Sequence, residues 1–323
     1  MNQPLLKVDN LSKHFGGAGA PVRAVDGVSF EIARGETLGL VGESGCGKTS
    51  LVRTLLRLNA PTSGTATLDG VDIAHAKGKS LRDMRRKMQV VFQDPYQSLN
   101  PRMRVDRLIA EPWVLHPDVL PRQEWPAEIA RLLEDVGLRA EHALRYPGEF
   151  SGGQRQRLGI ARALALGPSL LVCDEPVSAL DVSVQAQVIN LLARLRRERN
   201  LAMLFVAHDL AVVRHVSDRV MVMYLGKIIE TGPTKAIFSA AAHPYTQALL
   251  SSVPTPDPTQ RGKRKRIILT GDLPSPANPP SGCRFRTRCW KATAICAEQE
   301  PALIPRMGDG LLTACHHASK LAP

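Results

Sequence analysis

The chain has 323 residues, of which 44% are hydrophobic and 22% are charged. This composition is that of a globular protein of about two domains, so a disordered or collagen-like chain is excluded. The net charge of +12 favours anionic partners, such as a nucleotide, a nucleic acid or the negative inner face of a membrane. No apolar run reaches the roughly 18 residues of a membrane-spanning helix and no signal peptide is visible, so we expect a protein on the cytosolic side.

The composition changes near residue 235, and we expect two domains, over residues 1–235 and 236–323. In the first, short apolar runs alternate with helical patterns, which predicts an α/β domain with a largely parallel sheet. The chain beyond Ser251 holds ten of the 24 prolines. We therefore expect an irregular, linker-like stretch over residues 254–280, with a basic patch at 261–266.

Four apolar runs of the first domain have the length of strands, and polar residues follow each of them. The runs are Thr37–Val41, Met88–Phe92, Leu170–Cys173 and Leu201–Ala207. The residues that follow are Gly42, Gln93, Asp174 with Glu175, and His208. Because ligands of open α/β sheets bind beyond the carboxyl ends of the strands, these polar residues could converge on one site.

Helices are predicted at three places by periodicity and by stop signals. Residues 50–58 and 154–166 have helical patterns, and the second ends at Gly167-Pro168. The third pattern has apolar residues at the i, i+4, i+7, i+8 spacing of a buried helix face, namely Val184, Val188, Leu191, Leu192 and Leu195.

Residues 42–49, Gly-Glu-Ser-Gly-Cys-Gly-Lys-Thr, match the pattern G-x-x-x-x-G-K-[ST] at every fixed position. Glycines let the backbone wrap around a phosphate, and the N-terminus of the helix that follows adds a favourable dipole. Lys48 is predicted to reach the β- and γ-phosphates of a nucleotide, and the Thr49 hydroxyl to bind Mg²⁺. The alternative is a glycine-rich turn with an incidental lysine. The strand before the loop and the helix after it favour phosphate binding.

Two further features have a chemical and a structural interpretation. Asp174 and Glu175 end a predicted buried strand, where an unpaired charge is costly, so a divalent ion near the phosphates is a natural partner. Asp174 is then the Mg²⁺ ligand and Glu175 polarises the attacking water, although a surface acidic pair is the alternative. Residues 151–154, Ser-Gly-Gly-Gln, open a helix and could form a second anion-binding corner. An ordinary N-cap is the alternative there.

Together these motifs resemble those of the ATP-binding cassette (ABC) ATPases over about residues 5–235. Residues 151–157 look like the signature motif, Asp181 lies in a segment similar to the D-loop, Gln93 resembles the Q-loop glutamine, His208 the switch histidine, and Phe15 the aromatic residue that stacks on adenine. The resemblance implies a P-loop ABC ATPase domain with a RecA-like core, an antiparallel β subdomain and a helical subdomain, followed here by a small cysteine-rich extension.

The resemblance also implies a head-to-tail dimer with ATP between the phosphate loop of one subunit and the Ser151 corner of the other. The implied ATP-binding residues are Phe15, Gly42, Glu43, Ser44, Gly45, Cys46, Gly47, Lys48, Thr49, Ser50 and Gln93. The implied Mg²⁺ ligands are Thr49, Gln93 and Asp174. Glu175 is expected to be the general base, His208 to hold the γ-phosphate, and Lys48 to complete the catalytic set. Residues that act across the dimer are Ser151, Gly152, Gly153 and Gln154.

A finer resemblance is to the ATPase subunits of dipeptide/oligopeptide importers, in particular the second of the two paired ATPases. It rests on residues 92–102, on His243-Pro244-Tyr245-Thr246 and on the terminal cysteines. It implies an ATP-hydrolysing peripheral subunit at the cytoplasmic face of the inner (cell) membrane. The implied partners are two transmembrane permease subunits, a second related ATPase and, indirectly, an extracytoplasmic solute-binding protein, with no nucleic acid.

Four of the six cysteines lie in the last 41 residues, with the spacing C-x₅-C-x₆-C-x₁₈-C. A cytosolic chain rarely keeps disulfides, so these cysteines indicate a metal site. The residues alone leave Zn²⁺ and a [4Fe–4S] cluster open, and His316 or His317 could replace a cysteine. The resemblance favours an iron–sulfur cluster, with zinc as the alternative, on Cys283, Cys289, Cys296 and Cys315.

Two other functions compete with transport. A nucleic-acid- or ribosome-associated ABC ATPase would suit the positive charge, but residues 50–150 hold no coiled-coil insertion of the DNA-repair type and only one ATPase domain is present. A redox or sensing protein would make the cysteines its working part. The intact set of Lys48, Asp174, Glu175 and His208 favours the ATPase as the working part.

Overall fold

The computed structural model describes residues 3–16, 21–253, 266–305 and 310–319. The chain divides into two compact units whose segments alternate along the sequence. The helical unit comprises residues 1–6, 32–36 and 68–206, and the phosphate-loop unit comprises residues 7–31, 37–67 and 207–323. The domain boundary expected at residue 235 stays a prediction.

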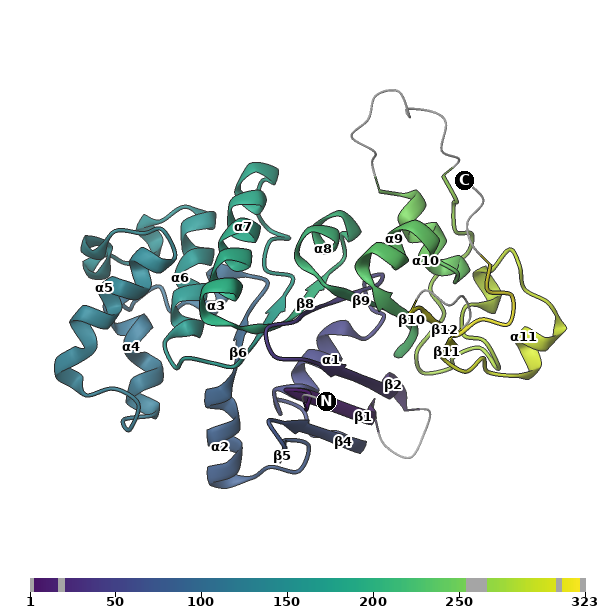
Figure 1. Ribbon diagram of the computed structural model, residues 1–323, viewed down its shortest axis with the longest axis horizontal. Helices are drawn as coiled ribbons and strands as arrows, with labels where there is room; N and C mark the ends of the chain where they lie inside the picture. The colour runs from purple at the N-terminus through teal and green to yellow at the C-terminus, as the bar shows by residue number, and fades with distance from the viewer. Residues whose placement is uncertain (1–2, 17–20, 254–265, 306–309, 320–323) are drawn as a thin grey trace. The chain divides into compact units, whose positions relative to one another are not determined.

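One sheet of the phosphate-loop unit has the strand order β11-β12-β10-β9-β3 (Figure 1). These strands are Ile304–Pro305, Leu312–Thr313, Lys227–Pro233, Arg219–Tyr224 and Thr37–Val41. β3 and β9 are parallel, with Leu40 opposite Met221, and the other neighbours are antiparallel. Every residue of β3 is buried, which explains a continuous apolar run where a half-exposed strand would alternate.

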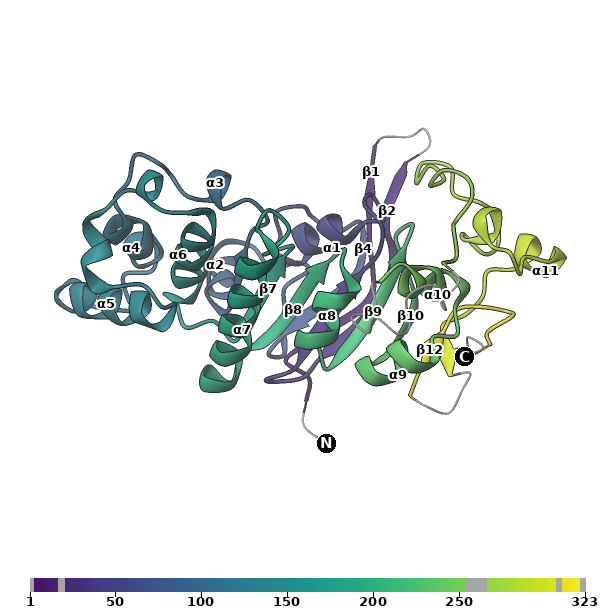
Figure 2. The same cartoon turned by 90° about the horizontal axis from the view of Figure 1, so that it is seen from above.

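A second sheet of this unit has the order β2-β1-β4, over Val22–Ile32, Leu6–Phe15 and Ser63–Leu68. Asn10 N donates to Ser29 Oγ (2.8 Å) and Gly27 N donates to Ser12 Oγ (2.9 Å). The partners therefore run in opposite directions along β1 and β2, as an antiparallel pair requires, and the two strands lie side by side in Figure 2. Neither strand was among those predicted, because polar residues interrupt their apolar ones.

The helices of the phosphate-loop unit are short. They are α1 (Lys48–Leu55), α8 (Leu210–Val216), α9 (Thr234–Ala240), α10 (Pro244–Ser251), the 3-10 turn η5 (Arg286–Arg288) and α11 (Ala294–Glu298). The described part of the expected linker, residues 266–280, contains no helix or strand, as predicted. Most of the expected basic patch lies outside the described residues.

The strands β8, β7 and β6 of the helical unit form a parallel ladder in that order. They are Ala202–Ala207, Leu170–Asp174 and Met88–Val91, and each bound lies within one residue of the prediction. The remaining elements are β5 (Val71–Asp72), α2 (Gly78–Lys87), α3 (Pro95–Ser98), α4 (Val105–Leu115), η1 (Arg122–Glu124), α5 (Trp125–Asp135), η2 (Ala140–Leu144), η3 (Pro147–Glu149), α6 (Gly152–Leu164) and α7 (Val182–Arg199).

Helices α4, α5 and α6 gather into a bundle in both views (Figures 1 and 2). The buried Trp113 of α4 donates its indole N–H to Ala165 O at 2.8 Å and lies 5.7 Å from the ring of Trp125. On α7, the predicted apolar face is buried except at Val184, which is only half-buried and contacts the α6 backbone at Gly153. Across the described residues, no helix combines the length and the apolar character needed to cross a membrane.

Candidate functional site

The phosphate loop closes around the ammonium group of Lys48, the first residue of α1. The buried Nζ of Lys48 donates to Gly42 O at 2.8 Å and to Glu43 O at 3.1 Å. Gly47 has a φ of +112°, and a Cβ there would lie 2.0 Å from Ala24 O. Only glycine fits this position, because the left-handed backbone and the close approach both exclude a side chain. Lys48 and Gly47 thus fix the backbone of the loop in a compact, wrapped conformation.

Backbone hydrogen bonds hold the loop at Cys46, whose thiol is buried in the protein. Cys46 N donates to Glu43 O at 3.3 Å, and Gly226 N donates to Cys46 O at 2.8 Å. Burial raises the pKa of the Cys46 thiol, which marks it as a packing group, not a nucleophile. Ser44 and Thr49 are exposed, by contrast. The hydroxyl of Thr49, which is predicted to bind Mg²⁺, is therefore accessible to a metal ion.

Two other predicted site residues lie in the phosphate-loop unit. His208 directly follows β8 and is exposed. Phe15 ends β1, its side chain is 37% exposed, and Lys13 Nζ lies 4.9 Å from its ring centre. An exposed aromatic ring at a strand end is available for stacking, as the resemblance predicts for adenine.

In the helical unit, the candidate base and the Q-loop glutamine contact each other. Asp174 is buried at the end of β7, and Glu175 follows it with a φ of +50°. Glu175 N donates to Val206 O at 3.0 Å, and Gln93 Nε2 donates to Glu175 Oε2 at 3.1 Å. A non-glycine residue in a left-handed conformation costs free energy and persists only where the surroundings hold it. A buried Asp174 and a constrained Glu175 backbone are not what the alternative of an exposed surface acidic pair predicts.

The signature segment caps helix α6 with its own side chains. Ser151 Oγ accepts a hydrogen bond from Gln154 N at 3.4 Å, and Gln154 Oε1 accepts one from Ser151 N at 3.0 Å. This reciprocal pair is a capping box, so Ser151 is the N-cap of α6. A role of residues 151–154 as an anion-binding corner stays a prediction. The helix begins at Gly152, two residues before the predicted start. Asp181 is the N-cap residue of α7 and is exposed.

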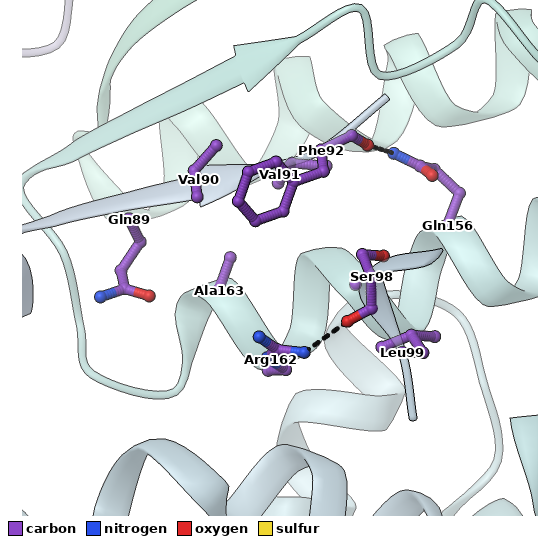
Figure 3. A pocket seen from close by; sticks show the side chains of 10 residues that line it. Gln89, Val90, Val91, Phe92, Ser98, Leu99, Gln156, Arg162 and Ala163 are labelled. Atoms are coloured by element: carbon purple, nitrogen blue, oxygen red, sulfur yellow. Dashed lines mark hydrogen bonds between the residues drawn. The ribbon is translucent and has the colours of Figure 1, made fainter. Parts of the chain in front are cut away.

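A small cavity of about 60 Å³ lies beside the segment that follows Gln93, within the helical unit (Figure 3). The α6 residue Gln156 donates to Phe92 O at 3.4 Å, and Arg162 of the same helix donates to Ser98 O at 2.7 Å. Phe92 itself is 41% exposed. Two hydrogen bonds thus join the segment around Gln93 to helix α6. A displacement of this segment is therefore expected to move the helix as well.

The four terminal cysteines have free thiols in one part of the phosphate-loop unit. The pKa of Cys283 is raised to about 11, mainly by burial and to a smaller extent by the other three thiols. Cys283 N donates to Cys296 O at 2.8 Å. Within the described ranges, however, no three His, Cys, Asp or Glu side chains are arranged to hold a metal ion. The geometry of the described residues therefore supports neither the iron–sulfur cluster nor its zinc alternative.

The two histidines considered as alternative ligands bond elsewhere. The ring nitrogen Nε2 of His317 lies 2.7 Å from Thr293 Oγ1, and that of His316 lies 3.0 Å from Gln299 O. Each contact engages one of the two ring nitrogens through which a histidine can bind a metal.

Two contacts of the phosphate loop were not predicted. Glu43 N donates to the hydroxyl of Tyr245 at 2.8 Å. The guanidinium of Arg288 binds the Glu43 carboxylate at two points, Nη1 to Oε2 at 2.6 Å and Nη2 to Oε1 at 3.2 Å. Tyr245 lies in the segment His243–Thr246 that the sequence singled out, but no local pattern marks Arg288.

Comparison with known proteins identifies the family. A family description of the ABC transporter matches residues 25–178, and one of the oligopeptide/dipeptide transporter C-terminal region matches residues 229–296. The chain belongs to the family of ABC transporter ATP-binding proteins, and it is an ABC-type ATPase.

Relatives resemble the chain over almost its whole length. It is 53% identical over 314 residues to the putative oligopeptide transport ATP-binding protein YkfD of Bacillus subtilis, covering 97% of this chain and 95% of that protein. It is 54% identical over 296 residues to the oligopeptide transport ATP-binding protein AppF of the same organism, covering 91% and 89%.

Solved structures support the fold. The cbiO1 protein of Clostridium perfringens, part of the ABC transporter complex cbiONQ, matches with a TM-score of 0.66 and 27% identity over 73% of this chain and 91% of that one. The ATP-binding cassette MJ0796 bound to ADP and phosphate matches with a TM-score of 0.64 and 27% identity, over 71% and 98%. The P-loop ABC ATPase fold expected from the sequence is confirmed.

Proposed function

We propose that this chain is the ATP-hydrolysing subunit of a multi-subunit ABC importer for dipeptides and oligopeptides. The observation that carries the peptide cargo is the similarity to two oligopeptide transport proteins along nearly the full length. Residues 229–296, which lie outside the ATPase motifs, also match the description of the oligopeptide/dipeptide transporter C-terminal region. A nucleic-acid-associated ATPase is not favoured, because these relatives are transport proteins.

The phosphate loop is proposed to bind ATP through residues 42–50. Lys48 Nζ now donates to two carbonyl groups of the loop, and phosphate oxygens are the acceptors that would replace them. The exposed ring of Phe15 is proposed to stack on the adenine. Backbone N–H groups and the N-terminus of α1 supply the remaining positive potential.

The donor set for Mg²⁺ is proposed to be Thr49, Gln93 and Asp174. A hydroxyl, an amide oxygen and a carboxylate are hard oxygen ligands of the kind that Mg²⁺ takes, so the residues fit this ion. When bound, Mg²⁺ neutralises charge on the β- and γ-phosphates.

Glu175 is proposed to accept a proton from the attacking water. The hydrogen bond from Gln93 supports this role, because it holds the carboxylate in one orientation. His208 is proposed to donate to the γ-phosphate. Residues 151–154 and Asp181 are proposed to act on the nucleotide of a neighbouring ATPase subunit.

The proposed partners are two transmembrane permeases, a second related ATPase and, indirectly, a solute-binding protein, with the chain peripheral at the cytoplasmic membrane face. The exposed Phe92 and its cavity support a contact with a membrane subunit, because α6 is bonded to this same segment (Figure 3). We propose the same division of labour along the chain, with residues 1–235 as the ATPase and 236–323 as the importer-specific extension.

We also propose that the four terminal cysteines hold a [4Fe–4S] cluster. The proposal rests on the resemblance to the importer ATPases and on four free cysteines in one part of the phosphate-loop unit, because the described side chains are not arranged as a metal site. Protein purified without oxygen is expected to carry about four iron and four sulfide ions with little zinc. A Cys289→Ala variant should lose the iron, whereas Cys173→Ala, at a buried strand position, should keep it. Zinc without sulfide would refute the cluster.

The importer is tested by affinity purification of the full-length Glu175→Gln variant with Mg-ATP from detergent-solubilised cells. Two polytopic membrane proteins and a second ABC ATPase are expected to co-purify. Lys48→Ala serves as the control that should not trap the ATP-bound assembly. Recovery of ribosomes or nucleic acid without membrane proteins would overturn the proposal.

A further inference from the structure

The phosphate loop contains an acid at its second position, although the loop must accept a polyanion. Glu43 is half-buried and lies within the segment 42–49 whose pattern predicts phosphate binding. An unpaired carboxylate there would repel ATP. Arg288 offsets this charge through a two-point contact with the Glu43 oxygens.

The segment that carries Arg288 is fixed to the body of the phosphate-loop unit. Phe285, only 1% exposed, lies 5.3 Å from the ring of Tyr224 and 5.4 Å from that of Tyr245. The buried Arg284 pairs with Asp26, whose other oxygen contacts the His14 ring at 3.0 Å. These contacts anchor the chain just before Arg288 to the rest of the phosphate-loop unit.

Two more residues from beyond the ATPase motifs contact the same loop. The hydroxyl of Tyr245 accepts from Glu43 N at 2.8 Å. The side chain of Leu273 lies 3.7 Å from the place where a Cβ of Gly45 would be. The loop is thus touched by three residues of the C-terminal extension, and only Arg288 contributes charge.

We propose that Arg288 is a positioning residue for ATP binding, which neutralises Glu43 and fixes the phosphate loop in its binding conformation. The C-terminal extension is then part of the nucleotide site, and any change in the cysteine segment is transmitted to ATP affinity through one ion pair. The inference rests on the proposed role of residues 42–50 in ATP binding.

The test is calorimetric titration of the full-length chain with a non-hydrolysable ATP analogue and Mg²⁺. Calorimetry separates the fraction of competent protein, seen as stoichiometry, from the affinity of each competent molecule. Arg288→Gln is expected to raise Kd on the order of tenfold at unchanged stoichiometry. Arg286→Gln is the matched control, because Arg286 lies on the same turn and, among the described residues, its guanidinium donates to Ser281 and not to Glu43.

The decisive variant is the double substitution Glu43→Gln with Arg288→Gln. If Arg288 acts by neutralising Glu43, the double variant recovers most of the affinity lost in the single one. A loss of structure alone would not be rescued in this way. If Arg288→Gln does not fold, Arg288→Met keeps the apolar stem among the aromatic rings and is expected to show the same rise in Kd.

The outcomes separate the two proposals. A Kd for Arg288→Gln and Arg288→Met equal to that of Arg286→Gln overturns the inference, and so does a double variant that binds no better than Arg288→Gln. ATP binding by Lys48→Ala equal to that of the wild type would instead overturn the proposed phosphate loop, and this inference with it.

Discussion

Glu175 combines three constraints at one residue. It has a left-handed backbone, its N–H bonds to Val206, and its carboxylate accepts from Gln93. Glutamine at this position has nearly the same shape and can still accept the hydrogen bond through its amide oxygen. Replacement by glutamine therefore removes basicity with little change in structure.

Glu175→Gln is expected to bind ATP as the wild type does and to hydrolyse it at least about 100-fold more slowly, because general-base catalysis contributes about that much. Phosphate release by the assembled transporter and binding of an ATP analogue measure the two effects. Glu198→Gln, at an exposed site on α7, should leave both unchanged. Normal turnover in Glu175→Gln would remove it from the mechanism.

Gly47 can be tested against a glycine with a similar backbone but free space. Gly47→Ala places a Cβ 2.0 Å from Ala24 O, whereas Gly70, with a φ of +76°, has nothing within 4 Å. Gly70→Ala is expected to cost about 1 kcal/mol of unfolding free energy, and Gly47→Ala about 3 kcal/mol or more together with ATP binding. Chemical denaturation measures the difference. Equal costs would mean that the close approach at Gly47 is not required.

At the scale of the element, helix caps determine where the site helices begin. The capping box at Ser151 and Gln154 starts α6 at Gly152, although two glycines open it. Helix α10 begins with a buried histidine instead. His243 Nδ1 accepts from Tyr245 N at 3.0 Å, which requires that nitrogen to be unprotonated.

His243 predicts a specific acid sensitivity. Burial lowers its pKa to about 3 from the value of 6.5, so between these values the unfolded chain binds a proton that the folded chain does not. Stability from this group is therefore complete above about pH 6.5 and falls as the pH decreases toward 3. Below about pH 6 the wild type is expected to lose up to about 1.4 kcal/mol per pH unit more than His243→Asn, since asparagine also caps helices.

Urea unfolding at several pH values measures this difference between His243→Asn and the wild type. His215→Asn, on an exposed position of α8, is the control and should follow the wild type. Parallel pH profiles for wild type and His243→Asn would contradict the assignment.

At the scale of the whole molecule, the C-terminal extension completes the core of the phosphate-loop unit. Thr313 of β12 donates to the buried Glu230 of β10 at 3.0 Å, and Phe285 packs against the rings of both Tyr224 and Tyr245. Removing the extension would leave a buried carboxylate with fewer donors and an aromatic cluster open to water.

A chain that stops after Ser251 is therefore expected to be at least about 3 kcal/mol less stable, from the loss of the buried Phe285 alone. Thermal unfolding of the truncated and full-length chains measures the loss. An independent ATPase of unchanged stability would show that the extension is only an attachment.

The sequence was sufficient to predict those elements whose residues form a local pattern of apolar residues or a motif. The strands β3, β6, β7 and β8 are continuous apolar runs, and the predicted bounds are off by at most one residue. The phosphate loop and its helix follow from one motif. β9 has the same apolar character and was not singled out, while β1 and β2 alternate with polar residues that weaken the pattern.

Contacts between distant parts of the chain could not be predicted. Gln93 and Glu175 are 82 residues apart, and the residues of the Glu43–Arg288 pair are 245 apart. Motifs indicated that Gln93 and Glu175 matter, but only the fold shows that they touch. For Arg288 no motif exists, because a single arginine among 42 basic residues carries no local signature.

The alternation of segments also determines the order in which contacts can form while the chain is synthesised on the ribosome. Most of the helical unit is one continuous segment, residues 68–206, whereas the phosphate-loop unit joins residues 7–31 and 37–67 to residues from 207 onward. Strand β3 obtains its partner β9 only after residue 224 has emerged, and Glu43 obtains its arginine only after residue 288. On the proposed role of Arg288, the nascent chain carries the phosphate-binding sequence well before it binds ATP with full affinity, because that affinity requires residue 288.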